Sequence, residues 1–130
     1  MRYKLELVPL PVADVDASLA FYRDTLGFAV DIDVEPSPGA RVVQVTPPGS
    51  GCSLGFGTGF EVYRGEPGSV RGLHLVVEDV DAARAELLGR GVAVSEVRDY
   101  GRGVRGADFA DPDGNSFELQ EMAWRRGAAF

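Results

Sequence analysis

The sequence predicts an α+β protein in which two tandem βαβββ modules form a curved mixed-sheet cavity. The main observation is an internal repeat: "VADVDA" from Val12 returns as "VEDVDA" from Val77, and "GFAV" from Gly27 returns as "GVAV" from Gly91. The spacing between the two motifs is one residue shorter in the second copy. A pattern that recurs together with its flanking segments indicates two copies of one supersecondary structure.

Length and composition indicate one domain over residues 1–130. The chain is 45% hydrophobic and 25% charged, which is ordinary for a globular protein of a size that can bury a core. We expect internal modules at about 3–60 and 70–122. The segment "GFEVYRGEPGSV" joins them as a loop with a bend at Pro67 and Gly68.

Each copy begins with an apolar strand followed by a helix. "KLELVPLPV" and "RGLHLVVE" predict the strands. Asp14 and Asp79 are typical helix N-caps, and Asp16 and Asp81 fall in the first turn, where a carboxylate favours the helix dipole. The glycines of the two repeated motifs are placed to end the helices. Residues at helical spacing give each helix an apolar stripe: Val15, Leu19, Tyr22 and Leu26, then Val80, Ala83 and Leu87.

Three strand-like runs follow each helix. They are "FAVDIDVEP", "ARVVQVTP" and "GCSLGFGT" in the first copy, and "VAVSEVRD", "VRGADFAD" and "NSFELQEM" in the second. "PSPG", "PPGSG" and "DPDG" are strong turn signals between them. A four-stranded sheet with a helix on one face leaves its other face bare. Two such faces can enclose a hollow that suits a small molecule.

Charge and rare residues restrict the function. The net charge of −7 argues against nucleic acid as a partner, because phosphates would be repelled. No apolar run is long enough for a membrane span, and the first residues lack a signal-peptide block, so we expect a cytoplasmic protein with no membrane partner. Cys52 is the only cysteine and His74 the only histidine. One chain therefore cannot supply a disulfide, a thiolate cluster or a two-histidine metal site.

Three segments carry a resemblance to a known family: "VADVDASLAFYRDTLGF", "LHLVVEDVDAA" and "DPDGNSFELQE". They make the chain, from about Leu5 to Met122, similar to the vicinal oxygen chelate superfamily, which includes glyoxalase I, bleomycin resistance proteins and extradiol dioxygenases. The resemblance implies a fold of paired βαβββ modules and a homodimer. In the metal-dependent branches it also implies four protein ligands, one on the first and one on the last strand of each module.

Only one of those four ligand positions holds a metal-binding side chain. The last-strand position of the second module falls on Glu118, whereas the first-strand positions fall on Leu7 and Gly72. The fourth lies in "CSLGFG", which has no acid, histidine or amide. A shift in register would bring in Glu6 or His74. If a metal is bound, Glu118 and His74 are expected to hold it.

The candidate ligand-binding residues are those expected near the hollow, and no catalytic residue is identified. A carboxylate facing the hollow needs a partner, such as His74, an arginine or a cationic ligand, because an unpaired buried charge is costly. The arginines of "RDYGRGVRG" indicate a mobile lid or a solvated basic loop. Tyr100 is expected in a loop. The candidates are Glu118, His74, Leu7, Phe56, Tyr63 and Tyr100.

Two classes of function follow. The first hypothesis is a metal-free small-molecule-binding protein that sequesters a drug or metabolite and needs no cofactor. The alternative is an enzyme, a metal-dependent lyase, isomerase or dioxygenase, in which a divalent metal ion polarises vicinal oxygens. A regulatory domain that recognises a metabolite is a third possibility, and the sequence does not separate it from the first.

Overall fold

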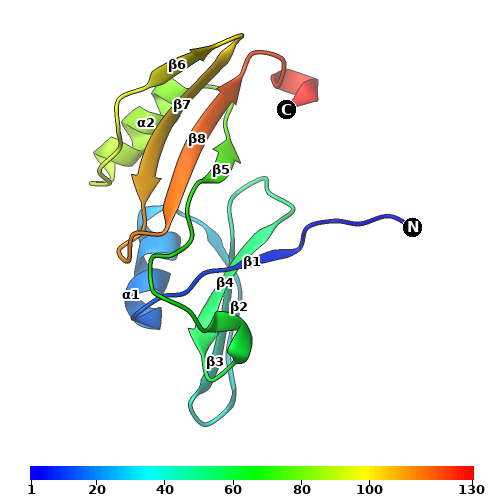
Figure 1. Ribbon diagram of the computed structural model, residues 1–130, viewed down its shortest axis with the longest axis vertical. Helices are drawn as coiled ribbons and strands as arrows, with labels where there is room; N and C mark the ends of the chain where they lie inside the picture. Colours follow the sequence, from blue (N-terminus) through cyan, green and yellow to red (C-terminus); the bar gives the residue numbers. More distant parts are fainter. The chain divides into compact units, whose positions relative to one another are not determined.

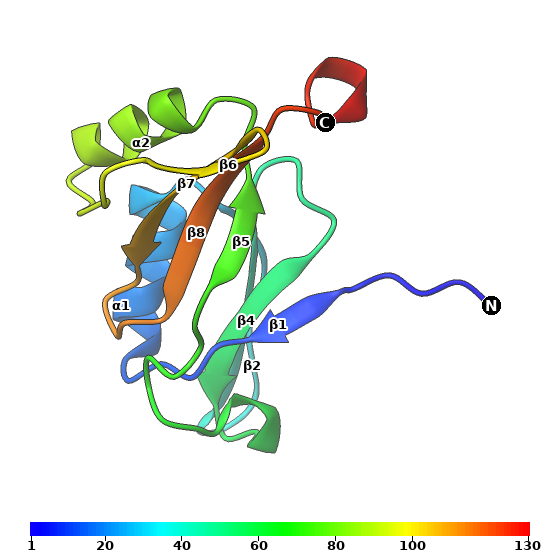
Figure 2. The same cartoon turned by 45° about the horizontal axis from the view of Figure 1, so that its top comes forward.

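The computed structural model describes residues 1–130 as two compact units (Figures 1 and 2). The first unit comprises residues 1–70 together with the turn 111–114. The second comprises residues 71–110 and 115–130. Neither α1 nor α2 has the length and apolar character of a membrane-spanning helix.

The first unit is a four-stranded sheet with one helical segment. Its strand order is β1-β4-β3-β2, with β1 parallel to β4 and the other pairs antiparallel. The elements are β1 (Leu7–Pro9), α1 (Val15–Leu19), the π-helical segment η1 (Ala20–Thr25), β2 (Ala29–Ser37), β3 (Ala40–Thr46), β4 (Ser53–Thr58) and the 3₁₀ turn η2 (Glu61–Tyr63).

The second unit repeats this topology. Its strand order is β5-β8-β7-β6, with β5 parallel to β8, so the prediction of two βαβββ modules is confirmed. The elements are β5 (Leu73–Val76), α2 (Val80–Gly89), β6 (Arg98–Gly101), β7 (Val104–Ala110), β8 (Ser116–Met122) and the 3₁₀ turn η3 (Gly127–Ala129).

The predicted helix signals are confirmed at both helix starts. The carboxylates of Asp14 and Asp79 each accept a hydrogen bond of 3.0 Å from the backbone three residues on. Gly27 and Gly91, at φ 76° and 83°, take the left-handed conformation that follows a helix. The π-helical segment η1 takes up the extra residue of the first copy, because a π turn holds more residues than an α turn.

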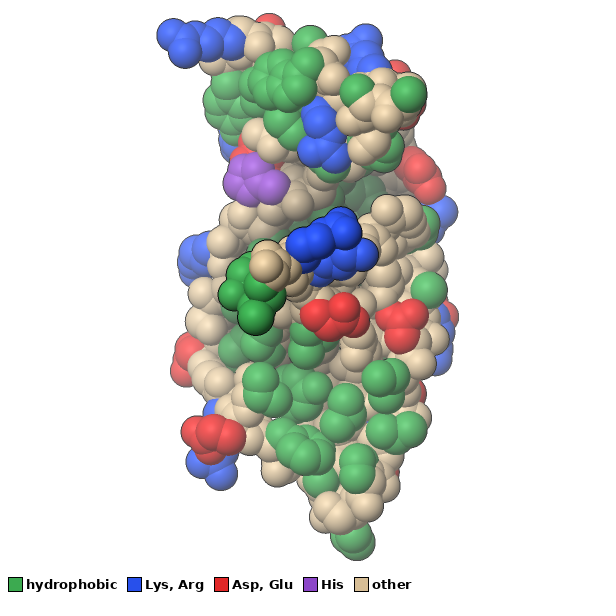
Figure 3. Space-filling model, turned by 90° about the vertical axis from the view of Figure 1, so that its right-hand side faces the viewer, with side chains coloured by type: hydrophobic (Ala, Val, Ile, Leu, Met, Phe, Trp, Pro, Cys, Tyr) green, Lys and Arg blue, Asp and Glu red, His purple; other side chains and the backbone are tan.

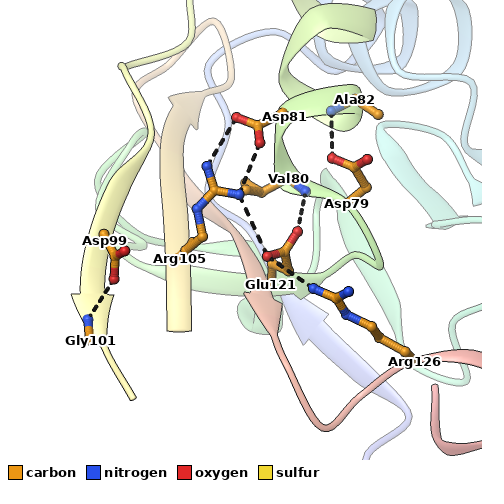
Figure 4. Close-up of polar contacts among 9 residues, drawn as sticks. All are labelled: Asp79, Val80, Asp81, Ala82, Asp99, Gly101, Arg105, Glu121 and Arg126. Carbon is orange, nitrogen blue, oxygen red and sulfur yellow. Dashed lines mark hydrogen bonds and ion pairs between the residues drawn. The ribbon is translucent and has the colours of Figure 1, made fainter. Parts of the chain in front are cut away.

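An ion pair between a strand arginine and a helix aspartate recurs in both units. Arg41 of β3 contacts Asp16 at 2.6 Å, and Arg105 of β7 contacts Asp81 at 2.9 Å. The guanidinium of Arg105 lies between Asp81 and the carboxylate of Glu121 (Figure 4). From the sequence, the positions of these two aspartates were explained only by their favourable interaction with the helix dipole. Their arginine partners were missed, since nothing in the sequence fixes the strand register.

The core of the first unit is centred on Tyr22. Its ring is fully buried and lies 5.6 Å from the ring of Phe56 and 5.9 Å from that of Phe28. Its hydroxyl donates a 2.8 Å hydrogen bond to Asp111, in the turn that belongs to this unit. Burial, followed by the nearby Asp111 charge, raises the pKa of Tyr22 above its usual range.

The strand before β7 is shorter than the sequence indicated. The run "VAVSEVRD" predicts a strand from Val92, but β6 spans only Arg98–Gly101. The earlier part is held instead by hydrogen bonds through Ser95, whose amide donates to Asp108 and whose carbonyl accepts from Arg84. The prediction that Tyr100 lies in a loop is therefore wrong, and "RDYGRGVRG" is a β6–β7 hairpin.

Replacing Tyr22 with Phe removes the hydrogen bond to Asp111. We expect the free energy of unfolding to fall by about 1–3 kcal/mol, the usual range for a buried hydrogen bond to a charged group. The native tyrosine is neutral in the folded state, so its contribution is present below the ordinary tyrosine pKa of about 10 and is lost at higher pH. Urea unfolding at several pH values measures both effects.

Tyr3, which is exposed, supplies the matched control. Tyr3→Phe should leave the unfolding free energy within about 0.5 kcal/mol of the native value. An equal effect of the two substitutions would contradict a structural role for the Tyr22 hydroxyl.

Replacing Asp79 with Ala removes the N-cap of α2. We expect a loss of about 0.5–2 kcal/mol in unfolding free energy, because the amide of Ala82 loses its acceptor. Asp79→Asn keeps a capping oxygen and should retain most of that stability. Thermal unfolding followed by circular dichroism compares the variants, and equal losses for Ala and Asn would show that capping is not the cause.

Candidate functional site

The pleat of β8 directs its side chains to two different faces of the second sheet. Phe117, Leu119 and Glu121 are buried on the face that α2 covers, where Glu121 accepts a 3.1 Å hydrogen bond from the amide of Val80. Because side chains alternate along a strand, Glu118 points to the opposite face. That uncovered side is called the open face of the second sheet.

His74 and Glu118 form a pair on this open face. They are directly opposite in the register of β5 and β8, and Nε2 of His74 lies 3.2 Å from Oε2 of Glu118. The histidine side chain is 50% exposed and the glutamate side chain only 15%. His74 is the purple side chain at the surface in Figure 3. The pair therefore presents an accessible imidazole in front of a largely enclosed carboxylate.

The backbone fixes the orientation of the imidazole. Nδ1 of His74 lies 2.6 Å from the carbonyl oxygen of Gly72, an acceptor, so Nδ1 carries a hydrogen in this contact. The other ring nitrogen, Nε2, faces Oε2 of Glu118.

The second carboxylate oxygen of Glu118 has no partner. Oε1 is buried and accepts no hydrogen bond. It lies so close to Gly106 of β7 that a Cβ there would be 2.1 Å away, and the same Cβ would be 3.1 Å from the ring of Tyr100. Gly106 and Tyr100 thus enclose this oxygen.

Arg98 and Asp108 extend the polar part of the open face. Arg98 forms an ion pair with Asp108, which lies opposite Glu118 in the β7–β8 register. Hydrogen bonds to Asp108 and then to Tyr100 raise the pKa of Arg98. Asp108 was not identified as a candidate, although the alternation of side chains along "VRGADFAD" is consistent with its place on the open face. Its place beside Glu118 depends on a register that the sequence does not give.

The corresponding open face of the first sheet, on the side of β4 away from Phe56, mixes apolar side chains with the polar Gln44 and Ser53. Leu7 lies against Gly55 of β4, and the ring of Tyr63 lies over Gly57, with burial raising the pKa of its hydroxyl. Ile32 and Val34 of β2 are exposed. Hydrophobic side chains gather over this unit in the lower part of Figure 3.

Phe56 does not reach this surface. Its ring is 0% exposed and packs on Tyr22, on the opposite side of β4 from Gly55 and Gly57. The candidates therefore divide into three groups. His74, Glu118 and Tyr100 share one face, Leu7 and Tyr63 share another, and Phe56 lies in the core.

The residues at the ligand positions do not fit a divalent metal. The repeat relates the His74–Glu118 pair to Pro9 and Gly55, which are also register partners and offer no side-chain donor. No group of three or more His, Cys, Asp or Glu side chains is placed to hold an ion. Zinc takes three or four protein donors, and calcium about six to eight oxygens, whereas this pair supplies two donors.

Comparison with solved structures gives relatives of nearly full length. TnmS3, described as an antibiotic binding protein from Streptomyces sp. CB03234, is 38% identical, with 94% of this chain and 98% of that chain covered and a TM-score of 0.80. A glyoxalase/bleomycin resistance protein from the same strain is 40% identical, with 91% and 100% covered and a TM-score of 0.74.

A member of the same superfamily from Sphaerobacter thermophilus DSM 20745 is 34% identical, with 92% and 98% covered and a TM-score of 0.77. No curated protein matches the chain. The family model for the Glyoxalase/Bleomycin resistance protein/Dioxygenase superfamily matches residues 4–119, a span that runs from before β1 into β8. The resemblance seen in the sequence is thus confirmed, and this chain belongs to that superfamily.

Proposed function

We propose that this protein binds a small organic molecule at the open face of the second sheet and sequesters it as a drug or metabolite. The observation that carries the proposal is the His74–Glu118 pair, an accessible imidazole in front of a carboxylate that retains an unused acceptor. A few polar groups placed together in this way can fix the orientation of a ligand.

The first unit carries side chains of a ligand-binding type on its own open face. Leu7 and Tyr63 offer hydrophobic and aromatic area of the type that small-molecule sites use. TnmS3, at 38% identity, is described as an antibiotic binding protein. Two statements remain predictions from the sequence: that the modules enclose a hollow, and that Tyr63 contacts a ligand in it.

Binding alone accounts for the residues present better than metal-dependent chemistry does. The enzyme alternative requires an ion that the donor set does not fit, because Leu7, Pro9 and Gly55 stand where donors are needed. Sequestration requires neither an ion nor a second acid or base. We therefore propose a metal-free binding protein.

We also propose that the protein is a homodimer. Ile32 and Val34, and also Val30, expose apolar side chains along β2, a strand with only β3 beside it in the sheet. A second copy that covers this surface would remove it from water. Sedimentation equilibrium of the native protein and of Ile32→Lys checks this, with a shift toward monomer expected for the variant.

The binding proposal predicts a ligand whose affinity depends on His74. A panel of antibiotics and metabolites is titrated by calorimetry against the native protein, His74→Ala and Glu96→Gln. We expect at least one compound to bind, with an affinity loss of about tenfold in His74→Ala, which corresponds to about 1.4 kcal/mol. Glu96 is exposed and lies in the segment before β6, outside the paired strands, so its variant should bind normally.

If no compound of a broad panel binds, or if the ligands bind His74→Ala and the native protein equally, this assignment is contradicted.

If the protein binds no metal, a chelator should not change its stability. Protein purified without chelator should contain no stoichiometric divalent metal by elemental analysis, and EDTA should leave its melting temperature unchanged, since two donors hold an ion weakly. A stoichiometric ion that is lost in Glu118→Gln would revive the enzyme alternative.

A further inference from the structure

The unpaired oxygen of Glu118 indicates what the site lacks. A buried carboxylate oxygen without a hydrogen bond is costly, and it accepts only from donors. The basic side chains around it already have partners: Arg98 contacts Asp108, and the imidazole of His74 contacts Oε2 of the same carboxylate. No side chain of the protein is left to donate to Oε1 in this arrangement.

Gly106 provides the space for that oxygen. Its backbone is not in the left-handed region, so glycine is not required there by conformation. A Cβ at this position would overlap Oε1 of Glu118 at 2.1 Å. The missing side chain therefore allows the carboxylate to lie flat against β7.

Tyr100 lies near this oxygen, and packing in the core does not fix the position of its side chain. Its side chain is 52% exposed and belongs to β6, a four-residue edge strand whose residues are all exposed. The β6–β7 register is irregular between Asp99 and Gly101, on either side of the tyrosine. Its hydroxyl lies near Arg98, another surface side chain, and contributes to the raised pKa of that guanidinium. Half of this side chain already faces solvent, so the ring has room to rotate outward.

A group that replaces the ring over Oε1 would contact a carboxylate and an aromatic face together. Ammonium groups favour this combination, because they donate charge-assisted hydrogen bonds and are attracted to the faces of aromatic rings. The net charge of −7 also favours the approach of a cation.

We propose that the ligand presents a protonated amine to Oε1 of Glu118, and that Tyr100 moves aside and lays its ring against this amine. The inference rests on the proposed function, because it specifies the ligand chemistry of the same open face. Gly106 acts as a positioning residue that keeps the carboxylate available.

Two probes of nearly equal shape test the proposal: 2-naphthylmethylamine, which is protonated at pH 7, and 2-naphthylmethanol, which is neutral. Their dissociation constants are measured by probe fluorescence for the native protein, Glu118→Gln and Glu96→Gln. We expect the native protein to favour the amine by about ten- to hundredfold, the usual effect of a hydrogen bond to a charged group. The preference should disappear in Glu118→Gln and persist in Glu96→Gln.

Gly106→Ala supplies a second variant, with circular dichroism as the check on folding. The added methyl group displaces the carboxylate, so a folded Gly106→Ala protein should lose the preference for the amine while it still binds the alcohol. Amide chemical shifts of Tyr100 and Gly106 should change with the amine in the native protein.

Equal binding of both probes by the native protein, or a preference that survives in Glu118→Gln, would overturn the amine inference and leave the proposed function intact. Binding of neither probe would also contradict it. The proposed function is contradicted by a different result: no compound of the wider panel binds, or the His74→Ala substitution leaves the affinity unchanged.

Discussion

The pleat of β8 places two glutamates, three residues apart, on opposite faces of one sheet, and the fold and the candidate site both depend on this division. Glu121 points to the helix, where the amide of Val80, Arg105 and Arg126 surround its carboxylate (Figure 4). Glu118 points away and has one histidine and one unused oxygen. The same residue type thus stabilises the fold on one face and is available for binding on the other.

Comparison of the two repeated units also separates the residues that stabilise the fold from those available for binding. Both units share the strand order, the helix N-caps and the arginine–aspartate pair, so these features serve the fold. At the positions where the second unit has His74 and Glu118, the first has Pro9 and Gly55. The second copy therefore carries a histidine–carboxylate pair at positions where the first copy has no ionisable side chain.

Local signals in the sequence were sufficient for the fold. Capping aspartates, terminal glycines and turn motifs act over a few residues, so they predicted both helices and most strands. The site depended on register and on which side of a strand faces the helix. Phe56 was therefore assigned to the ligand although it packs on Tyr22, and Asp108 was missed although it lies beside Glu118. Tyr100 was expected in a loop because β6 is too short to show an alternating pattern.

The most direct measurement compares the side-chain carboxyl ¹³C resonances of Glu118 and Glu121 while a bound ligand is titrated. If the open face binds the ligand, the Glu118 resonance shifts in proportion to occupancy and the Glu121 resonance stays in place. A saturating ligand that shifts Glu121 and leaves Glu118 unchanged would contradict the account.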